Sequence, residues 1–286
     1  ATLETGQSVV LRDQEGFILG VMNVEDIWPL DIEKEAKALY NTTDPAHPGV
    51  DYLNNKAGKF YIGGEVKALN LPIHSDFRQI RNTPVEVRQL FNKLGWKRII
   101  GFQTRQPIHR LQFEMTIQAM RQSKANLLLL PVAGVTRPGD FDHFTRMRCY
   151  ERVASHYPPD TLVMNLIPLS MRMAGPRDAL LNMIMGKNFG CTHLIVDPDH
   201  LVPENNGKGE SGLEYRQLKE LVKSASGELG VQTVTFEEMV YLPFEDEYQV
   251  AARVPENTET ICFTGDDIQK RIRKGKRIPD WATFPE

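Results

Sequence analysis

Between residues 98 and 235, short apolar segments alternate with longer segments in which apolar residues recur every three or four positions. The short segments are expected to be strands and the periodic ones helices. Strands are expected at 98–102, 126–132, 161–167, 192–196 and 231–235, with helices at 110–121, 144–157, 177–188 and 213–226. Apolar strands joined by helices form a parallel sheet with both faces covered, and right-handed crossovers make it a Rossmann-like, doubly wound α/β domain.

The segments on either side lack this alternation. Residues 1–97 contain two apolar runs around Gly16, which fit a hairpin, and a helical stretch at 31–40. Residues 236–286 form a smaller tail whose last helix is expected to stop at Gly275. The predicted order is therefore a β-rich domain over 1–97, the α/β domain over 98–235 and a small α-rich subdomain over 236–286.

Composition narrows the class of protein. The 286 residues are 41% hydrophobic and 25% charged with a net charge of -3, which argues against a disordered or fibrous chain and against a basic nucleic-acid coat. The longest apolar run, at 127–130, is too short to cross a bilayer, so we expect neither a nucleic-acid nor a membrane partner. Cys149, Cys191 and Cys262 are far apart, which favours buried free thiols in a reducing, cytoplasmic setting.

The loop after the first expected strand is the strongest candidate for a ligand site. It reads Gln103-Thr104-Arg105-Gln106-Pro107-Ile108-His109-Arg110. In an open α/β sheet, ligands bind beyond the carboxyl ends of the strands. Backbone donors, a helix dipole and cationic side chains together favour an anion there. The alternative is that Arg105 and Arg110 are solvated loop charges.

Three later loops carry weaker signals. Asp140, Asp142 and His143 precede a helix, where an N-cap is favoured over a metal site. The small residues Ala174 and Gly175 allow a ligand to approach the backbone, although a tight turn has the same composition. The segment Asp197-Pro198-Asp199-His200 offers acid and imidazole groups that suit a metal-nucleotide, or is a polar loop without a role. No phosphate-binding P-loop and no Gly-x-Ser-x-Gly motif is present, so kinase and hydrolase functions lose support.

These loops, in this order, resemble the ATP sulfurylase (sulfate adenylyltransferase) family. The matching segments are 42–50, 137–143, 145–151, 174–180 and 187–193, and the similarity runs from about residue 8 to the C-terminus. The resemblance implies a nucleotidyltransferase-type α/β domain preceded by a PUA-like barrel. We expect that barrel to be partial here, because its beginning has no counterpart in the sequence.

The resemblance also implies a reaction and a set of site residues. Sulfate attacks the α-phosphorus of MgATP, which gives adenosine 5′-phosphosulfate and pyrophosphate without a protein nucleophile. Mg²⁺ is expected to arrive with ATP, no metal ligand is assigned to the protein, and a homo-oligomer is expected. The residues implied are Thr104, Arg105 and His109 for catalysis; Gln103, Arg105 and Leu201 for sulfate; and Gln106, His109, Gln112, Gly175, Asp199 and His200 for the nucleotide.

Several of these positions depart from the family pattern. Gln106 replaces an Asn and Gln112 replaces a His, so the second of these can never carry a positive charge. Pro198 stands where the family has an Arg, Asp197 adds a negative charge, and Leu201 replaces a small Ala. We therefore expect weakened sulfate adenylyltransferase activity. The alternatives are a catalytically degenerate homologue that binds nucleotides or other subunits, and a nucleotidyltransferase with another acceptor.

Overall fold

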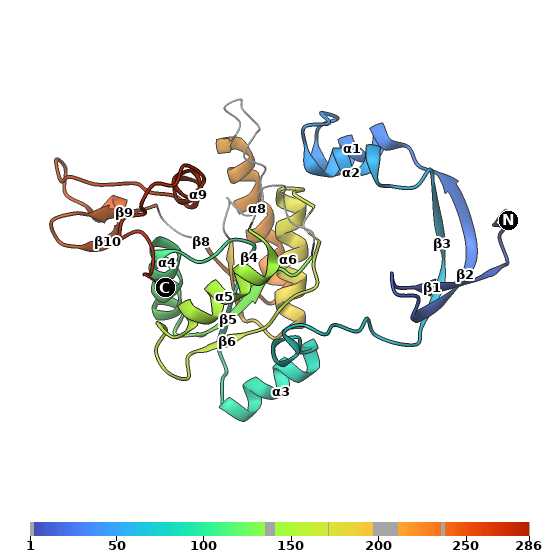
Figure 1. The fold of residues 1–286 in the computed structure, drawn as a ribbon, viewed down its shortest axis with the longest axis horizontal. Helices are drawn as coiled ribbons and strands as arrows, with labels where there is room; N and C mark the ends of the chain where they lie inside the picture. Colours follow the sequence, from blue (N-terminus) through green and yellow to red (C-terminus); the bar gives the residue numbers. More distant parts are fainter. Residues whose placement is uncertain (1–2, 135–140, 171, 197–210, 236–237, 286) are drawn as a thin grey trace. The chain divides into compact units, whose positions relative to one another are not determined.

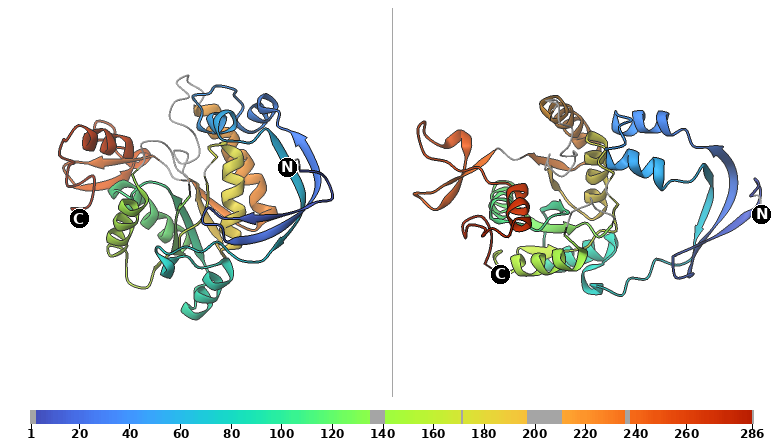
Figure 2. Two further views of the ribbon diagram at one scale, coloured as in Figure 1. Left: turned by 45° about the vertical axis from the view of Figure 1, so that its right-hand side comes forward. Right: turned by 45° about the horizontal axis from the view of Figure 1, so that its top comes forward.

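The computed structural model describes residues 3–134, 141–170, 172–196, 211–235 and 238–285. The chain divides into two compact units, residues 1–79 and residues 80–286. Figure 1 shows the first as a strand-rich part in blue and the second as a larger part in which strands and helices alternate, and Figure 2 gives two further views of each.

The first unit is built on an antiparallel sheet of three strands. The strands are β1 (Ser8–Arg12), β2 (Ile18–Pro29) and β3 (Phe60–Ala68), in the order β1-β2-β3. The expected hairpin around Gly16 is confirmed, because β1 and β2 pair antiparallel and Gly16 has a φ of 93° that favours glycine. Two helices, α1 (Ile32–Tyr40) and α2 (Pro48–Asn55), lie between β2 and β3 in the sequence.

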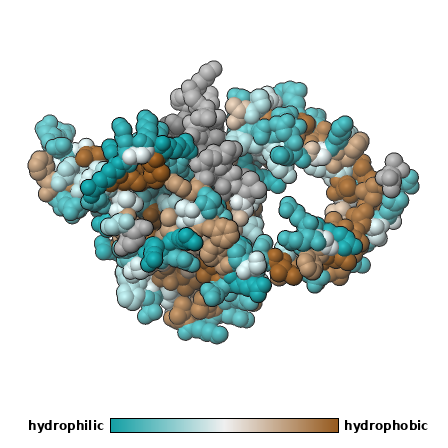
Figure 3. Space-filling model, in the orientation of Figure 1, coloured by the Kyte–Doolittle hydropathy of each residue, from teal (hydrophilic) through white to brown (hydrophobic). Residues whose placement is uncertain are grey.

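The apolar cluster of this unit lies between its two helices, and Val24 of β2 is also buried. Ala36 of α1 is buried against Val50 and Leu53 of α2. Large apolar side chains on and beside the strands are instead exposed, as the brown surface along the sheet in Figure 3 shows. They include Val10, Phe17, Trp28, Phe60, Ile62 and Val66.

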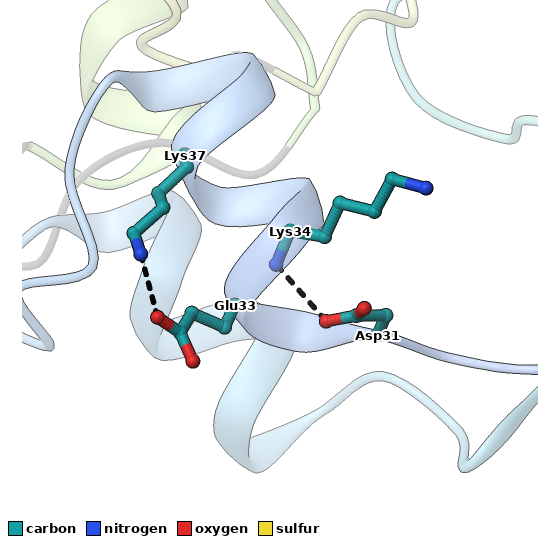
Figure 4. Close-up of polar contacts among 4 residues, drawn as sticks. All are labelled: Asp31, Glu33, Lys34 and Lys37. Atoms are coloured by element: carbon teal, nitrogen blue, oxygen red, sulfur yellow. Dashed lines mark hydrogen bonds and ion pairs between the residues drawn. The ribbon is translucent and has the colours of Figure 1, made fainter.

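Local hydrogen bonds fix the two helices. Asp31 caps α1 by accepting a hydrogen bond from the backbone N of Lys34 at 3.0 Å, and Lys37 pairs with Glu33 at 2.6 Å (Figure 4). The ion pair is exposed, so it contributes at most about 1 kcal/mol. At the start of α2, a Cβ on Gly49 would lie 2.3 Å from a ring carbon of Tyr40. Within segment 42–50, position 49 therefore needs glycine, because any larger residue would collide with the Tyr40 ring.

The second unit contains a five-stranded sheet in which all neighbouring strands pair in parallel. Its order is β6-β5-β4-β7-β8. β4, the first of these five strands along the chain, is therefore central, and the strand order reverses beside it. The strands are β4 (Ile99–Thr104), β5 (Asn126–Pro131), β6 (Leu162–Met164), β7 (His193–Val196) and β8 (Gln232–Thr235). This confirms the predicted parallel, doubly wound sheet.

Helices cover both faces of the sheet (Figures 1 and 2). On one face, Met183 of α6 and Val222 of α8 pack against Leu194 and Val196 of β7. On the other face lie α4 and α5 (Figure 1). The helices that connect the strands are α4 (Arg110–Ser123), α5 (His143–Ala154), α6 (Pro176–Asn188) and α8 (Ser211–Leu229).

A further helix, α3 (Pro84–Leu94), belongs to this second unit, which begins at residue 80 instead of the expected 98. Its start carries a capping box between Thr83 and Glu86. The reason for the earlier boundary is burial, because Val87 and Phe91 of α3 lie in one apolar cluster with strand residues of β4 and β5.

The tail after β8 differs from the α-rich subdomain that the sequence suggested. It contains an antiparallel hairpin of β9 (Met239–Leu242) and β10 (Glu247–Val250), a short 3₁₀ turn, and α9 (Gly265–Arg273). Trp281 stacks on Tyr241 of β9 with ring centroids 4.2 Å apart, so a residue more than 30 positions beyond the hairpin packs on it. No disulfide joins the three cysteines, and Cys262 is exposed, contrary to the expectation of buried thiols. Among the helices that the structure describes, none is long and apolar enough to cross a membrane.

We predict that α3 contributes to the stability of the α/β unit. Phe91→Ala removes a ring that is 3% exposed, and such truncations cost about 3–5 kcal/mol. Leu94→Ala on the same helix is the control, because Leu94 is 43% exposed. The measurement is the free energy of unfolding in urea, and equal losses in the two variants would show that α3 lies outside the core.

Candidate active site

The site lies at the carboxyl end of β4, where the strand order reverses. β4 pairs in parallel with β5 on one side and β7 on the other, so the carboxyl ends of these three strands lie at the same edge of the sheet. Connections on the two sides run over opposite faces, which opens a crevice at such a switch point. The loop from Arg105 to His109 starts at this position.

Polar side chains at this end of β4 are buried. Gln103, Thr104 and Arg105 are each 4% exposed or less. Both amide atoms of Gln103 lack a hydrogen-bond partner among the described residues. An unpaired buried amide costs about 1–3 kcal/mol, so this side chain does not stabilise the fold through its polar atoms and has a free donor and acceptor.

Hydrogen bonds within the loop hold its shape. The Thr104 hydroxyl donates to the backbone oxygen of Gln106 at 2.9 Å and accepts from the backbone N of Gln106 at 3.3 Å. Pro107 restricts the preceding residue to extended backbone. The sequence prediction placed Thr104 among catalytic groups, and in the structure its hydroxyl forms the tight turn that follows β4.

His109 is a neutral imidazole in this site. It precedes α4 as its N-cap residue without a side-chain capping bond, is 7% exposed, and its Nδ1 has no partner among the described residues. Loss of hydration on burial lowers the pKa of His109 to about 4. A phosphate oxygen would therefore meet a neutral hydrogen-bonding ring here.

Gln112, in the first turn of α4, also has a buried polar atom without a hydrogen-bond partner among the described residues. Its Oε1 atom is buried and has no hydrogen-bond partner in the described part of the chain. The side chain offers an amide donor and an acceptor, and no charge. Together with neutral His109, it leaves the start of α4 without the positive charge that two imidazolium groups would supply.

Gly175 begins α6 with a backbone conformation that requires glycine. Its φ is 55° and its ψ is -121°, and a Cβ there would meet no atom within 4 Å. The carboxylate of Asp178 accepts a hydrogen bond from the backbone N of Ala174 at 3.1 Å and fixes this turn, while burial raises the pKa of Asp178. The space beside Gly175 is therefore open, and the approach of a ligand to this backbone stays a prediction.

Of the remaining predicted positions, some lie outside the residues that the structure describes and others lie within them. Asp199, His200 and Leu201 lie outside the described residues, as does Asp140. Asp142 is the N-cap of α5, and its carboxylate accepts a hydrogen bond from the backbone N of Thr145 at 3.0 Å. The favoured capping interpretation is thus confirmed for Asp142. No group of three or more acidic, His or Cys side chains in the described ranges is placed to hold a metal ion.

Sequence reasoning missed two residues that support the loop from α5. Arg146 is 3% exposed and donates from Nη1 to the backbone oxygens of Arg105 at 3.1 Å and Val132 at 3.0 Å. Tyr150 donates to the backbone oxygen of Gln106 at 2.8 Å. A sequence pattern that could have identified them is a positively charged residue and a tyrosine on the buried face of an amphipathic helix.

The C-terminal tail also reaches this loop. Gln269 of α9 donates from Nε2 to the side-chain oxygen of Gln106 at 2.6 Å. A Cβ on Gly265, at the start of α9, would lie 3.4 Å from Nε2 of His109. The backbone oxygen of Ala282 accepts a hydrogen bond from the backbone N of Arg110 at 3.2 Å. The tail therefore covers His109 and part of the loop.

Comparison with known proteins assigns the chain to a family. The sequence profile of the ATP-sulfurylase family matches residues 78–286, and that of the PUA-like domain matches residues 1–71. The chain belongs to the ATP-sulfurylase family. The first match covers the whole α/β unit with its tail, and the second covers the three-stranded unit.

Relatives of this family agree over the whole chain. Sulfate adenylyltransferase from Gibberella zeae is 44% identical over 285 residues, which are 99% of this chain and 50% of the relative. The Aspergillus terreus protein of the same name is 43% identical over 287 residues, at 100% and 50% coverage. A solved structure, the hexameric APS kinase from Thiobacillus denitrificans, is 29% identical with a TM-score of 0.74, and covers 99% of this chain and 48% of its own. The chain thus spans about half the length of the relatives it matches.

We predict that burial of neutral His109 makes stability depend on pH. In the unfolded chain the imidazole binds a proton near pH 6.5, whereas in the folded protein it does so only near pH 4. The stabilising contribution is therefore complete above pH 6.5 and falls by about 3 kcal/mol as the pH drops toward 4. His109→Gln should lack this component. The measurement is the difference in unfolding free energy between wild type and variant across this window, and a constant difference would contradict a buried neutral imidazole.

Proposed function

We propose that this chain carries sulfate adenylyltransferase activity. In the reaction, an oxygen of sulfate attacks the α-phosphorus of MgATP, the bond between the α- and β-phosphates breaks, and pyrophosphate leaves with the bonding electrons. The products are adenosine 5′-phosphosulfate and pyrophosphate. The relatives that match the full chain bear this enzyme name, and the ATP-sulfurylase profile covers the unit that contains the site.

The observation that carries the proposal is the buried amide of Gln103. Both of its polar atoms lack partners among the described residues, and it lies two residues from a buried guanidinium at the end of the central strand. An amide donor and the planar fork of Arg105 suit a tetrahedral oxyanion. We assign Gln103 and Arg105 to sulfate, together with Leu201 from the resemblance.

The other side chains have roles around the nucleotide in this proposal. His109 and Gln112 donate hydrogen bonds to phosphate oxygens, Gln106 keeps the loop in place, and Gly175 allows the nucleotide close to the backbone. Asp199 and His200 complete the nucleotide site by resemblance. Catalysis then consists of alignment and charge stabilisation, because sulfate is the nucleophile. Mg²⁺ enters as part of the substrate MgATP.

The proposed activity is weak by family standards. Positive charge around the phosphate oxygens stabilises the transition state of such transfers. In this chain Gln112 and Pro198 supply none, Asp197 adds a negative charge, and His109 is neutral near pH 7. These substitutions are also the observation that favours the second candidate function, a nucleotide-binding homologue without turnover or one that uses another acceptor.

The setting proposed for this activity follows from weaker signals. The APS kinase relative is described as hexameric, and we propose that this chain also forms a homo-oligomer. We also propose a cytoplasmic location, which is consistent with three cysteines that form no disulfide. The proposed ligands there are ATP and sulfate. Light scattering on the purified chain tests the oligomer directly.

We predict that Arg105→Ala weakens sulfate binding about tenfold or more, because a charge-assisted hydrogen bond contributes about 1.5–3 kcal/mol. Arg121→Ala is the matched control, since Arg121 lies exposed on α4. Isothermal calorimetry with sodium sulfate measures both affinities. Unchanged affinity in Arg105→Ala would remove Arg105 from the site.

We predict that restoring the family residues raises turnover. The combined variant Gln112→His, Asp197→Gly, Pro198→Arg and Leu201→Ala returns two potential positive charges and a small residue to the ligand loops. Each charged contact is worth about 2–4 kcal/mol in the transition state, so pyrophosphate release at saturating MgATP and sulfate should rise by at least tenfold. Absence of activity in both folded proteins would favour the non-catalytic function, and turnover with another oxyanion alone would favour the different acceptor.

A further inference from the structure

Helix α5 contacts two consecutive carbonyl groups of the loop that follows β4. Arg146 donates from Nη1 to the backbone oxygen of Arg105 at 3.1 Å, and Tyr150 donates from its hydroxyl to the backbone oxygen of Gln106 at 2.8 Å. The two donors are four residues apart, so they lie on the same face of the helix. A single rigid element therefore fixes two successive peptide groups.

The Arg146 guanidinium also joins two strands. The same Nη1 atom donates to the backbone oxygen of Val132 at 3.0 Å, just beyond the end of β5. It thus connects the segments that leave β4 and β5. The planar, preorganised guanidinium suits such a bridge better than a flexible ammonium does.

The burial of Arg146 needs an explanation beyond packing. Its side chain is 3% exposed and its Nε atom has no partner in the described part of the chain. Of the acidic groups that the structure describes, none forms an ion pair with it. A buried cation without a carboxylate is unfavourable unless it serves another purpose. Here its Nη1 atom donates to the backbone oxygens of Arg105 and Val132.

We propose that Arg146 and Tyr150 are positioning residues, which fix the Arg105 and Gln106 peptide groups so that the Arg105 side chain meets the oxyanion in one orientation. Fixed peptide planes set the direction of the Cα–Cβ bond of Arg105 and limit the places its guanidinium reaches. Misplacement by about 1 Å is enough to cost on the order of a hundredfold in rate. The inference rests on the proposed function for the choice of sulfate as the ligand.

The main test is Tyr150→Phe beside Tyr157→Phe. Both changes remove one buried hydroxyl, but the Tyr157 hydroxyl bonds to Thr116, 2.7 Å away on α4, and not to the loop. Loss of one hydrogen bond to the loop should weaken sulfate binding about fivefold and speed hydrogen exchange of the loop amides at residues 106, 108 and 109 by a similar factor. Tyr157→Phe should change each by less than about twofold on the same scale.

The second test uses the charge-conserving Arg146→Lys and the neutral Arg146→Met. Lysine keeps one donor for the carbonyls, so its sulfate affinity should fall about tenfold, and methionine should lose more. Arg152→Lys is the control, because Arg152 is exposed on the same helix. Where Arg146→Met does not fold, the tyrosine pair still decides.

The outcomes separate this inference from the proposed function. Faster loop exchange in Tyr150→Phe than in Tyr157→Phe, with weaker sulfate binding and unchanged folding, supports it. Equal exchange and equal affinity in the two variants overturn it while leaving the proposed function intact. If the wild type binds no sulfate and releases no pyrophosphate, the proposed function fails, and the exchange comparison alone decides the positioning role.

Discussion

The burial of the whole of β4 is the constraint on which the rest of the α/β unit depends. All six residues from Ile99 to Thr104 are buried, and the strand has a parallel neighbour on each side. A strand in this position is part of the buried core. The loop that follows it, from Arg105 onward, therefore begins inside the protein. The last two residues of β4 are polar, and the fold thereby buries the side chains of Gln103 and Thr104.

Burying these polar side chains lowers the stability of the folded protein, and apolar burial in other parts of the sheet offsets that loss. The amide of Gln103 and the ring of His109 have unmet polar atoms within the described chain, which costs free energy in the folded state. The neighbouring strand compensates, because Leu127, Leu128, Leu129 and Leu130 are fully buried and apolar on both faces of the sheet. Sites where local rules are broken are where function is expected, and the unpaired buried polar atoms of the described residues lie at the end of β4, in the loop after it, and on α4 and α5.

The sequence predicted the parallel sheet because its strands are apolar throughout and its helices are amphipathic. It did not place α3 in the α/β unit, although the capping box at Thr83 and Glu86 is a local signal for that helix. The hairpin of β9 and β10 packs against Trp281, which lies more than 30 residues further along the chain, and no local pattern reveals that contact. Arg146 was missed for a related reason, since its acceptors are carbonyl groups 14 and 41 residues away in the sequence.

The bond between Gln269 and Gln106 has a consequence for how the protein is made. It joins residues 163 positions apart, and α9 also covers His109. During synthesis the β4 loop leaves the ribosome before α9 does, so this loop gains its contact with α9 only through a pairing of high sequence separation. A nascent chain that stops before α9 would lack the Gln269 amide and the Gly265 backbone, and the polar groups of the β4 loop would stay more exposed to water until α9 packs on them.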